Sequence, residues 1–500
     1  MASHERFKFK TLEQIRQKSR DLNLRLEYSE DLSPLALPAK IGKKTAPNRL
    51  AIHPMEGCDS LPGGGPSELV ERRYMRLARG GAGLIWWEAC AVVREGRANE
   101  LQMMLTKDNL PAFSSLVKQT RKAAAGANGA GFSPVYVLQL THSGRYSRPK
   151  GHKMSPVIPQ HDPILDPRCG VKPEDPVVTD KYLDSLVQKY VRSALLAKEA
   201  GFDGVDIKAC HRYLISELLA SYTREGKYGG SYENRTRLLR TIIAEVRKAC
   251  GPDFIIACRF NVFDAHPYPY GFGEDRANPD DFMKFAPAEP MRLTADLRDA
   301  GVDLLSNSAG NPYYIYPQVT RPFDTSSMGI PVPREHQLES IQRLFDFTAL
   351  VQNIAGNIPV AGNGYSWLRQ FMPYAGAANI AAGRCAFLGL GRAAFAYPDI
   401  PFDILNEGRL KPESCCAACS KCTQIMRDHG CTGCVLKDPE IYAPIYREAR
   451  SEAEKRELAA AGQAAAPGPR TKPITAQKAA RQTTAAPGPA AKTQKKTAPK

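Results

Sequence analysis

The sequence predicts an α/β protein whose main part is a (β/α)8 TIM barrel, followed by a small cysteine-rich module and a disordered tail. Three observations support this prediction. Strand-like apolar runs alternate with amphipathic helical stretches, this alternation occurs eight times between residues 49 and 396, and cysteines concentrate in one short segment after it. Such alternation is typical of parallel strands connected by helices. A doubly wound sheet is the alternative, but the sequence has no G-x-G-x-x-G turn after an early strand.

The elements of the barrel follow one another along the chain as short apolar runs and longer amphipathic stretches. The expected strands cover residues 49–55, 83–89, 134–140, 204–209, 254–260, 302–308, 358–363 and 379–384. The expected helices cover residues 66–79, 109–125, 179–200, 233–249, 289–300, 335–355, 365–376 and 385–396.

Polar residues lie at or just after the ends of most of these strands. Active sites of TIM barrels lie at the C-terminal ends of the strands, so these residues are the candidates for chemistry. One polar residue at the start of a loop carries little information, but their recurrence favours a site. They are His53, Glu56, Glu88, Gln139, His142, Lys208, His211, Arg259, Ser308, Asn363 and Gly364.

The net charge of +16 is concentrated at the C-terminus, because residues 461–500 carry eight basic side chains and no acid. This tail is rich in Ala, Pro, Thr and Lys and has almost no large apolar residue, so it cannot offset the entropy of ordering. We therefore expect a disordered, solvated tail. A weak electrostatic tether to an acidic partner or nucleic acid is the alternative.

Neither a membrane span nor a secretion signal is expected. No stretch approaches about 18 uninterrupted apolar residues, and the first twenty residues lack an apolar signal core. We therefore expect a cytoplasmic protein with no membrane partner and no specific nucleic-acid partner. Thiols stay reduced in that compartment, so clustered cysteines more often bind metal than form disulfides.

The segment from Cys415 to Cys434 contains six of the thirteen cysteines. The spacing Cys416-x2-Cys419-x2-Cys422-x11-Cys434 suits a [4Fe–4S] cluster, which needs four thiolates. Two C-x2-C pairs, Cys419 with Cys422 and Cys431 with Cys434, would equally suit a four-cysteine zinc site. The spacing alone leaves both sites open.

Five motifs, taken in order, resemble the old yellow enzyme family of FMN-dependent NADH:flavin oxidoreductases. The layout is most similar to that of its larger iron–sulfur members, 2,4-dienoyl-CoA reductase and trimethylamine dehydrogenase, without their C-terminal nucleotide-binding domains. The resemblance covers roughly residues 30–435. The motifs are NRLAIHPM (48–55), LQLTHSGR (138–145), HRYL (211–214), YGGSYENRTR (228–237) and FLGLGRAAFAYPD (387–399).

The resemblance implies an FMN site built from several strand ends. Gln139 would bind the pyrimidine edge of the flavin, and Arg259 would lie where negative charge develops on its reduced form. The phosphate would be bound by backbone N–H groups and by Arg392. The residues expected to contact FMN are Pro54, Met55, Ala89, Gln139, Arg259, Gly362, Asn363, Gly364, Gly391 and Arg392.

The same resemblance assigns a catalytic set after the fourth strand. The family's His-x-x-His or His-x-x-Asn pair, which binds the carbonyl oxygen of the substrate, reads as Lys208-x-x-His211 here. A lysine is a stronger point charge than a neutral imidazole, although a salt-bridged structural lysine is the alternative. Tyr213 matches the family's proton donor, and a packed tyrosine is the alternative. Tyr313 and Tyr314 would shape the same pocket.

The family context favours a [4Fe–4S] cluster on Cys416, Cys419, Cys422 and Cys434, with Cys415 or Cys431 as possible substitutes. We therefore expect an FMN-binding barrel over residues 1–410, an iron–sulfur module over 411–448, and a short helix with a disordered basic tail over 449–500. NAD(P)H or a separate electron-transfer protein would exchange electrons with the enzyme, and the protein could form oligomers.

Three functions remain open from the sequence. The first is reduction of an activated C=C bond of a small organic substrate by hydride from flavin N5. The second is oxidation of an amine or other C–N bond, with electrons leaving through the cluster. The third is a zinc-stabilised barrel without catalytic activity.

Overall fold

The computed structural model describes residues 4–278, 281–313, 323–324 and 332–465, with side chains up to residue 459. The chain divides into two units, Met1–Ala453 and Glu454–Lys500, of which the first contains the barrel. Within the described residues, no helix is both long enough and apolar enough to cross a membrane.

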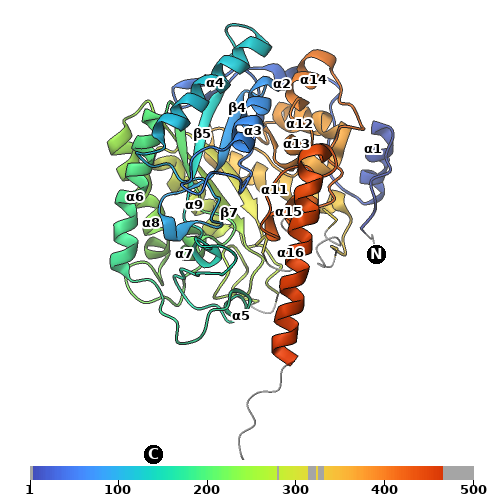
Figure 1. Cartoon of the computed structure of the whole chain (residues 1–500). Helices are drawn as coiled ribbons and strands as arrows, with labels where there is room; N and C mark the ends of the chain where they lie inside the picture. Colours follow the sequence, from blue (N-terminus) through green and yellow to red (C-terminus); the bar gives the residue numbers. More distant parts are fainter. Residues whose placement is uncertain (1–3, 279–280, 314–322, 325–331, 466–500) are drawn as a thin grey trace, which may run out of the picture. The chain divides into compact units, whose positions relative to one another are not determined.

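The centre of the first unit is one curled, seven-stranded parallel sheet (Figure 1). The strand order is β8-β7-β6-β5-β4-β3-β9, so neighbours in the chain are neighbours in the sheet except at β9. The strands are β3 (Leu50–Ile52), β4 (Leu84–Ala91), β5 (Val135–Thr141), β6 (Gly204–Ile207), β7 (Ile255–Phe263), β8 (Leu304–Ala309) and β9 (Leu388–Leu390).

Two isolated bridges close this sheet into a barrel. Leu305 of β8 pairs in parallel with Val360, and Ala361 pairs in parallel with Phe387, which directly precedes β9. Residues 360–361 therefore occupy the position of the remaining strand. The predicted (β/α)8 barrel is confirmed, and the doubly wound alternative is wrong because the two edges of the sheet meet.

Helices surround the barrel, with their apolar faces packed on the strands (Figure 1). Their starts are well capped, since the side chains of Ser67, Thr179 and Ser231 each accept a hydrogen bond from a backbone N–H of the first turn. The helices that follow the strands are α3 (Glu68–Arg79), α4 (Leu110–Asn128), α6 (Asp180–Glu199), α7 (Leu214–Leu219), α8 (Tyr232–Cys250), α9 (Ala288–Asp299), α11 (Gln337–Ala355), α12 (Met372–Ala381) and α13 (Arg392–Ala396).

One predicted strand is wrong. Residues 379–381 are the end of α12 and residues 382–384 form the turn after it. This Ala-rich helix has Pro373 in its first turn and ends before Gly383, which has φ +66°. The last strand is β9 instead, which lies inside the predicted helix 385–396. The short apolar run of β9 could not be distinguished from a helix by its periodicity.

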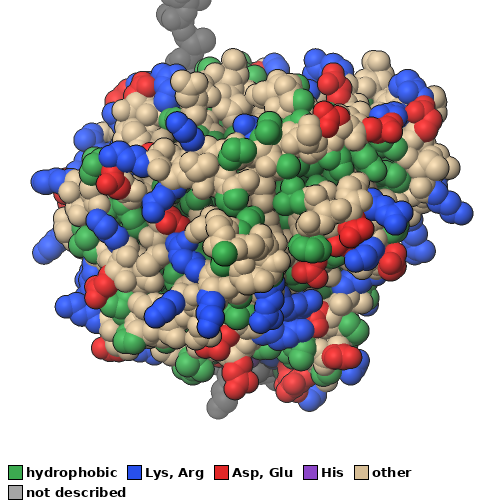
Figure 2. Space-filling model, turned by 90° about the horizontal axis from the view of Figure 1, so that it is seen from above, with side chains coloured by type: hydrophobic (Ala, Val, Ile, Leu, Met, Phe, Trp, Pro, Cys, Tyr) green, Lys and Arg blue, Asp and Glu red, His purple; other side chains and the backbone are tan. Residues whose placement is uncertain are grey.

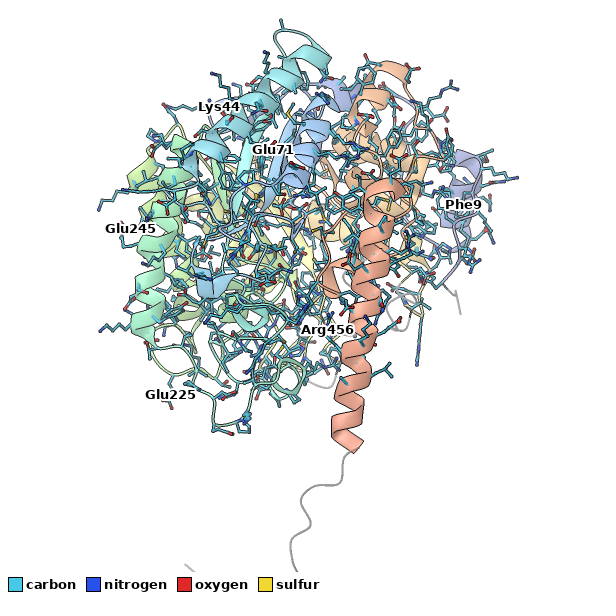
Figure 3. All side chains as sticks on the ribbon, viewed as in Figure 1. Phe9, Lys44, Glu71, Glu225, Glu245 and Arg456 are labelled. Atoms are coloured by element: carbon cyan, nitrogen blue, oxygen red, sulfur yellow. The ribbon has the colours of Figure 1, made fainter. Side chains whose placement is uncertain are left out.

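An N-terminal hairpin closes one end of the barrel. It consists of β1 (Ala39–Ile41) and β2 (Lys44–Ala46), and Lys44 is labelled in Figure 3. Ala39, Ile41 and Ala46 pack against the inward-facing side chains from the N-terminal halves of the strands. With this end filled by apolar side chains, the opposite end, where the strands terminate, is the one that can hold a site.

Smaller elements complete the described chain. They are α1 (Leu12–Asp21), α2 (Ser33–Ala36), α5 (Asp166–Cys169), α14 (Ile400–Glu407), α15 (Lys421–Arg427), α16 (Pro439–Ala465) and the 3₁₀ segments Arg94–Gly96, Gly144–Tyr146 and Tyr365–Phe371. On the face seen in Figure 2, Lys and Arg side chains are interspersed with Asp and Glu side chains, as on an ordinary solvated surface.

Candidate active site

A cavity of about 200 Å³ lies at the C-terminal ends of the barrel strands. It brings together all three predicted catalytic residues, Lys208, His211 and Tyr213. Two predicted cofactor contacts, Ala89 and Gly362, do not line it. The predicted cofactor residues that do line it are Pro54, Met55, Gln139, Arg259, Asn363, Gly364, Gly391 and Arg392.

The strand ends after β9 and after residues 360–361 form a close-packed glycine cradle. A Cβ atom on Gly389 would lie 2.0 Å from His53 Nε2 and 2.1 Å from the carbonyl oxygen of Gly362. Gly364 has φ +94°, a conformation that side chains disfavour. Gly364, Gly389 and Gly391 line the cavity, and glycines allow a ligand to approach the backbone closely, as a phosphate-binding loop requires.

Two arginines in the cavity lack acidic partners. The Nε atoms of Arg259 and Arg392 are buried without a hydrogen-bond partner, and neither guanidinium is ion-paired within the described part of the chain. Burial lowers the pKa of Arg392, which shows how little compensating charge surrounds it. An anionic ligand in this cavity would supply the missing partners.

Gln139 is fixed by a buried carboxyl group. Its Nε2 donates to Asp206 Oδ2 over 2.6 Å, and Asp206 also accepts from Trp86 Nε1 and from the backbone N–H of Arg259. Burial raises the pKa of Asp206 to about 6. With the amide nitrogen of Gln139 engaged, its amide oxygen is the group that remains for a ligand N–H.

Lys208, Glu56 and Tyr213 form one connected group. Lys208 Nζ lies 3.1 Å from Glu56 Oε1 and 4.0 Å from the centre of the Tyr213 ring. Tyr213 OH lies 3.3 Å from Glu56 Oε1 and 2.9 Å from Tyr313 OH. Burial, and next the charge of Glu56, raises the pKa of Tyr213 well above its usual value. The phenol therefore carries its proton at neutral pH, as an ordinary tyrosine does.

His211 is placed by an unusual backbone. His211 and the next residue, Arg212, both have left-handed φ values, +65° and +58°. Arg212 is fully buried and ion-paired with Asp264 and Asp162, which holds this turn in place. As a result, His211 Nε2 lies 3.1 Å from Ser308 Oγ at the end of β8.

The predicted metal ligands border a second, smaller hollow. Cys416, Cys419, Cys422 and Cys434 all line it, whereas Cys415 and Cys431 do not. Burial, followed by the nearby Cys422 thiol, raises the pKa of Cys416 to about 12. A bound cation would keep the Cys416 thiol deprotonated at neutral pH. In the described ranges, no three His, Cys, Asp or Glu side chains converge closely enough to hold a single metal ion.

The thiol hollow adjoins the main cavity. Cys422 and Arg392 line both. A group held by the four thiols would therefore lie next to a ligand in the main cavity.

Several residues of the main cavity were not singled out from the sequence. Met426, Arg427 and Thr432 come from the cysteine module, and no local pattern indicates that they would reach the barrel. Tyr313 lines the cavity as expected, and Tyr314 lies outside the described residues. Lys208 forms a salt bridge with Glu56, as the alternative interpretation of a salt-bridged lysine expected. Both residues nevertheless line the cavity.

Comparisons with known proteins agree with this geometry. The chain is 28% identical over 388 residues to an NADH oxidase from Thermoanaerobacter brockii, covering 76% of this chain and 52% of that protein. It is 27% identical to a metal reductase from Desulforamulus reducens, covering 85% of this chain and 55% of that protein. The chain thus spans about half the length of these curated relatives.

Among solved structures, the fold matches a 2-naphthoyl-CoA reductase complex with a TM-score of 0.63 and 21% identity, over 81% of this chain and 57% of that one. At this identity the likeness concerns the fold. The family model of the NADH:flavin oxidoreductase / NADH oxidase family matches residues 34–307, more than half of the chain. With the barrel and the strand-end cavity, this match shows that the chain belongs to that family of FMN-dependent oxidoreductases.

Proposed function

We propose that this chain binds FMN and a [4Fe–4S] cluster and reduces an activated C=C bond of a small organic substrate. The observation that carries the proposal is the gathering of Lys208, His211 and Tyr213 in one cavity with Arg259 and Arg392, whose buried Nε atoms have no hydrogen-bond partner among the described residues. The first three suit a carbonyl-bearing substrate, and the arginines suit an anionic cofactor.

The residues present fit FMN. Arg392 and the glycine cradle at Gly389 and Gly391 would hold its phosphate, while Gln139 and Arg259 would contact its ring system. FMN supplies a hydride when it is bound and reduced. Arg259 provides a fixed positive charge for the anionic form of the reduced ring.

Lys208 and His211 would bind the carbonyl oxygen of the substrate. Both donate hydrogen bonds, and an oxygen that gains negative charge as the C=C bond is reduced is bound more tightly than the ground-state carbonyl. The Glu56 carboxylate balances the charge of Lys208, and Ser308 orients the His211 ring. The pair is thus positioned before the substrate arrives.

Tyr213 OH would deliver the proton to the α-carbon. The phenol is protonated at neutral pH, as a tyrosine ordinarily is, and burial followed by the charge of Glu56 raises its pKa further. After donation, Lys208 Nζ, 4.0 Å from the ring centre, would stabilise the phenolate. Tyr313 OH, at 2.9 Å from Tyr213 OH, is placed to return a proton.

The four thiols of Cys416, Cys419, Cys422 and Cys434 would hold the cluster, which supplies one-electron exchange. Because Cys422 also lines the main cavity, electrons would pass over a short distance to or from FMN. NAD(P)H at the flavin or a separate electron-transfer protein would be the partner in this exchange.

Oxidation of an amine is the second candidate. The gathering of Tyr146, Tyr213 and Tyr313 could surround a cation, since Tyr146 and Tyr313 stack with ring centroids 4.1 Å apart. Lys208 and Arg427 in the same region would repel a cationic amine. The geometry therefore favours the reduction of a C=C bond.

The test is a single-turnover experiment on the reduced holoenzyme, mixed anaerobically with 4-phenylbut-3-en-2-one. Tyr213→Phe should slow flavin reoxidation by roughly 10²–10⁴-fold, the usual contribution of a general acid. Tyr190→Phe is the matched control, because Tyr190 is buried outside the cavity and its hydroxyl has no partner among the residues that the structure describes. Unchanged reoxidation in Tyr213→Phe would remove its role, and rapid flavin reduction by amines with no reaction of the enone would favour amine oxidation.

A further inference from the structure

A second large cavity, of about 260 Å³, adjoins the main one. The two share Glu56, Tyr313, Met426 and Arg427 in their walls. A substrate held by Lys208 and His211 could therefore extend past Tyr313 into the second cavity. None of the proposed catalytic steps uses this space.

Basic side chains dominate the second cavity. Three arginines line it, Arg148, Arg168 and Arg427, together with His429. Glu56 is the one carboxylate among its described lining residues, and its charge is already balanced by Lys208. The cavity is consequently positive without a bound ligand.

Two of these arginines are not ion-paired. Arg148 Nη1 lies 3.1 Å from His429 Nε2, and Arg427 Nη2 donates to the carbonyl oxygen of Pro312. Within the residues that the structure describes, neither guanidinium has a carboxylate within ion-pairing distance. The undescribed stretches 314–322 and 325–331 contain no Asp or Glu in the sequence.

The remaining wall is apolar and aromatic. Met154 and Leu165 line the second cavity, and the stacked rings of Tyr146 and Tyr313 form the side towards the main cavity. Such a wall suits a flat or aliphatic body, while the arginines suit an anionic end. Guanidinium groups match carboxylates in both charge and planar geometry.

We propose that the second cavity binds a carboxylate at the far end of the substrate, through Arg148 and Arg427. The substrate class is thus a small apolar enone or enal with a remote carboxylate. The proposal rests on the proposed function for the position of the reacting end, but binding of the carboxylate can be measured without turnover.

The binding test uses a pair of non-reacting ligands of nearly equal shape, 4-(3-oxobutyl)benzoate and its methyl ester. Isothermal titration of the oxidised holoenzyme should show that the acid binds at least about tenfold more tightly than the ester, as expected for a charge-assisted hydrogen bond. Higher salt should weaken binding of the acid and leave the ester unaffected. Equal affinity of the two would overturn the proposal.

Substitutions of Arg148 and Arg427 test whether these two residues bind the carboxylate. Arg148→Gln and Arg427→Gln should each lower the affinity for the acid by about tenfold and change that for the ester little. Arg148→Lys and Arg427→Lys, which keep the charge, should retain part of the preference. The control is Arg79→Gln, at an exposed position of α3 outside both cavities. If the Gln variants lower the affinities for the acid and for the ester equally, the arginines have a structural role and the proposal is wrong.

Turnover separates this proposal from the proposed function. The reduced enzyme is mixed with 4-(3-oxobut-1-enyl)benzoate or with its methyl ester. Reduction of both at equal rates and affinities would support the proposed function and overturn the carboxylate site. Preferential binding of the saturated acid without reduction of either enone would support the carboxylate site and overturn the proposed function.

Discussion

The barrel and the cysteine module are stabilised in different ways. In the barrel, strands such as β4 and β5 are buried along their whole length, and helices cover them with apolar side chains. The described module has a small apolar cluster of its own, in which Ile425 and Val435 pack against Tyr442 of α16. Cys415, Cys416 and Ala418 of the module also join the core of the barrel. Its backbone takes left-handed conformations at Ala418 and Ser420.

Polar contacts connect the module to the barrel. Asp438 pairs with Arg72 and Arg76 of α3, and the backbone N–H of Thr432 donates to the carbonyl oxygen of Gly57 over 2.6 Å. Apolar burial contributes most of the stability of a fold, and the module has little of it. We infer that the barrel folds around its own core, whereas the module depends on the group that its thiols hold.

Among these predictions, removal of one cysteine thiol should have the largest effect, the loss of the bound metal. Cys416→Ser should abolish iron binding and its absorbance near roughly 400 nm, while FMN binding persists because the substitution changes one atom at the border of the barrel core. Cys431→Ser is the matched control and should keep its iron, since Cys431 does not line the hollow. Metal and flavin analysis of the anaerobically purified variants checks this.

The opposite pattern would change the ligand set. Loss of metal in Cys431→Ser with retention in Cys416→Ser, together with one zinc per chain, would support the two C-x2-C pairs of a zinc site. Loss of FMN along with the metal would show that the barrel does not fold around its own core but depends on the module.

Arg392 lies where the two regions meet, because it lines both the main cavity and the thiol hollow. Arg392→Gln should weaken FMN binding by about 10–100-fold, the range of one lost charge-assisted hydrogen bond. Quenching of flavin fluorescence on titration of the apoprotein measures the affinity. Arg79→Gln should leave it unchanged, and equal FMN affinity of Arg392→Gln and the original chain would place the phosphate elsewhere.

The smallest effect is expected at Asp438. Although burial raises its pKa, hydrogen bonds and ion pairs with Arg72 and Arg76 lower it below the ordinary value. Asp438→Asn should cost only about 0.5–1 kcal/mol of unfolding free energy at neutral pH, since Arg72 and Arg76 are about one-third exposed. Because the folded-state pKa is depressed, this stabilisation exists above the unfolded pKa, roughly 4, and disappears as the pH falls below it.

Urea unfolding of the holoenzyme at several pH values measures this difference. Asp299→Asn, at a more exposed pair with Arg298, is the control and should change stability less. If Asp438→Asn costs as much at acidic pH as at neutral pH, the carboxylate charge is not what connects the module to α3.

Much of the barrel could be predicted because its signals are local. Helices such as α6 and α8 have apolar periodicity and N-capping residues, and both were predicted within one or two residues of their observed ends. The prediction of a strand at 379–384 was wrong because a short apolar run fits a helix and a strand equally well. The placement of Lys208, His211 and Tyr213 in one cavity followed from the general position of TIM-barrel sites.

The periodicity of the sequence indicated a barrel, and the cysteine spacing indicated a metal site. Flavin binding and the choice of four thiols came from the resemblance of its motifs to the old yellow enzyme family. Tertiary structure alone decided which side chains meet. It pairs Glu56 with Lys208 and Tyr213, and it brings Arg427 and Arg148 into the wall of the same cavity. It also separates Cys431 from the four thiols despite its proximity in sequence. The reason is physical: pattern and spacing act within a few residues, whereas a cavity forms where distant segments are brought together by burial of the core between them.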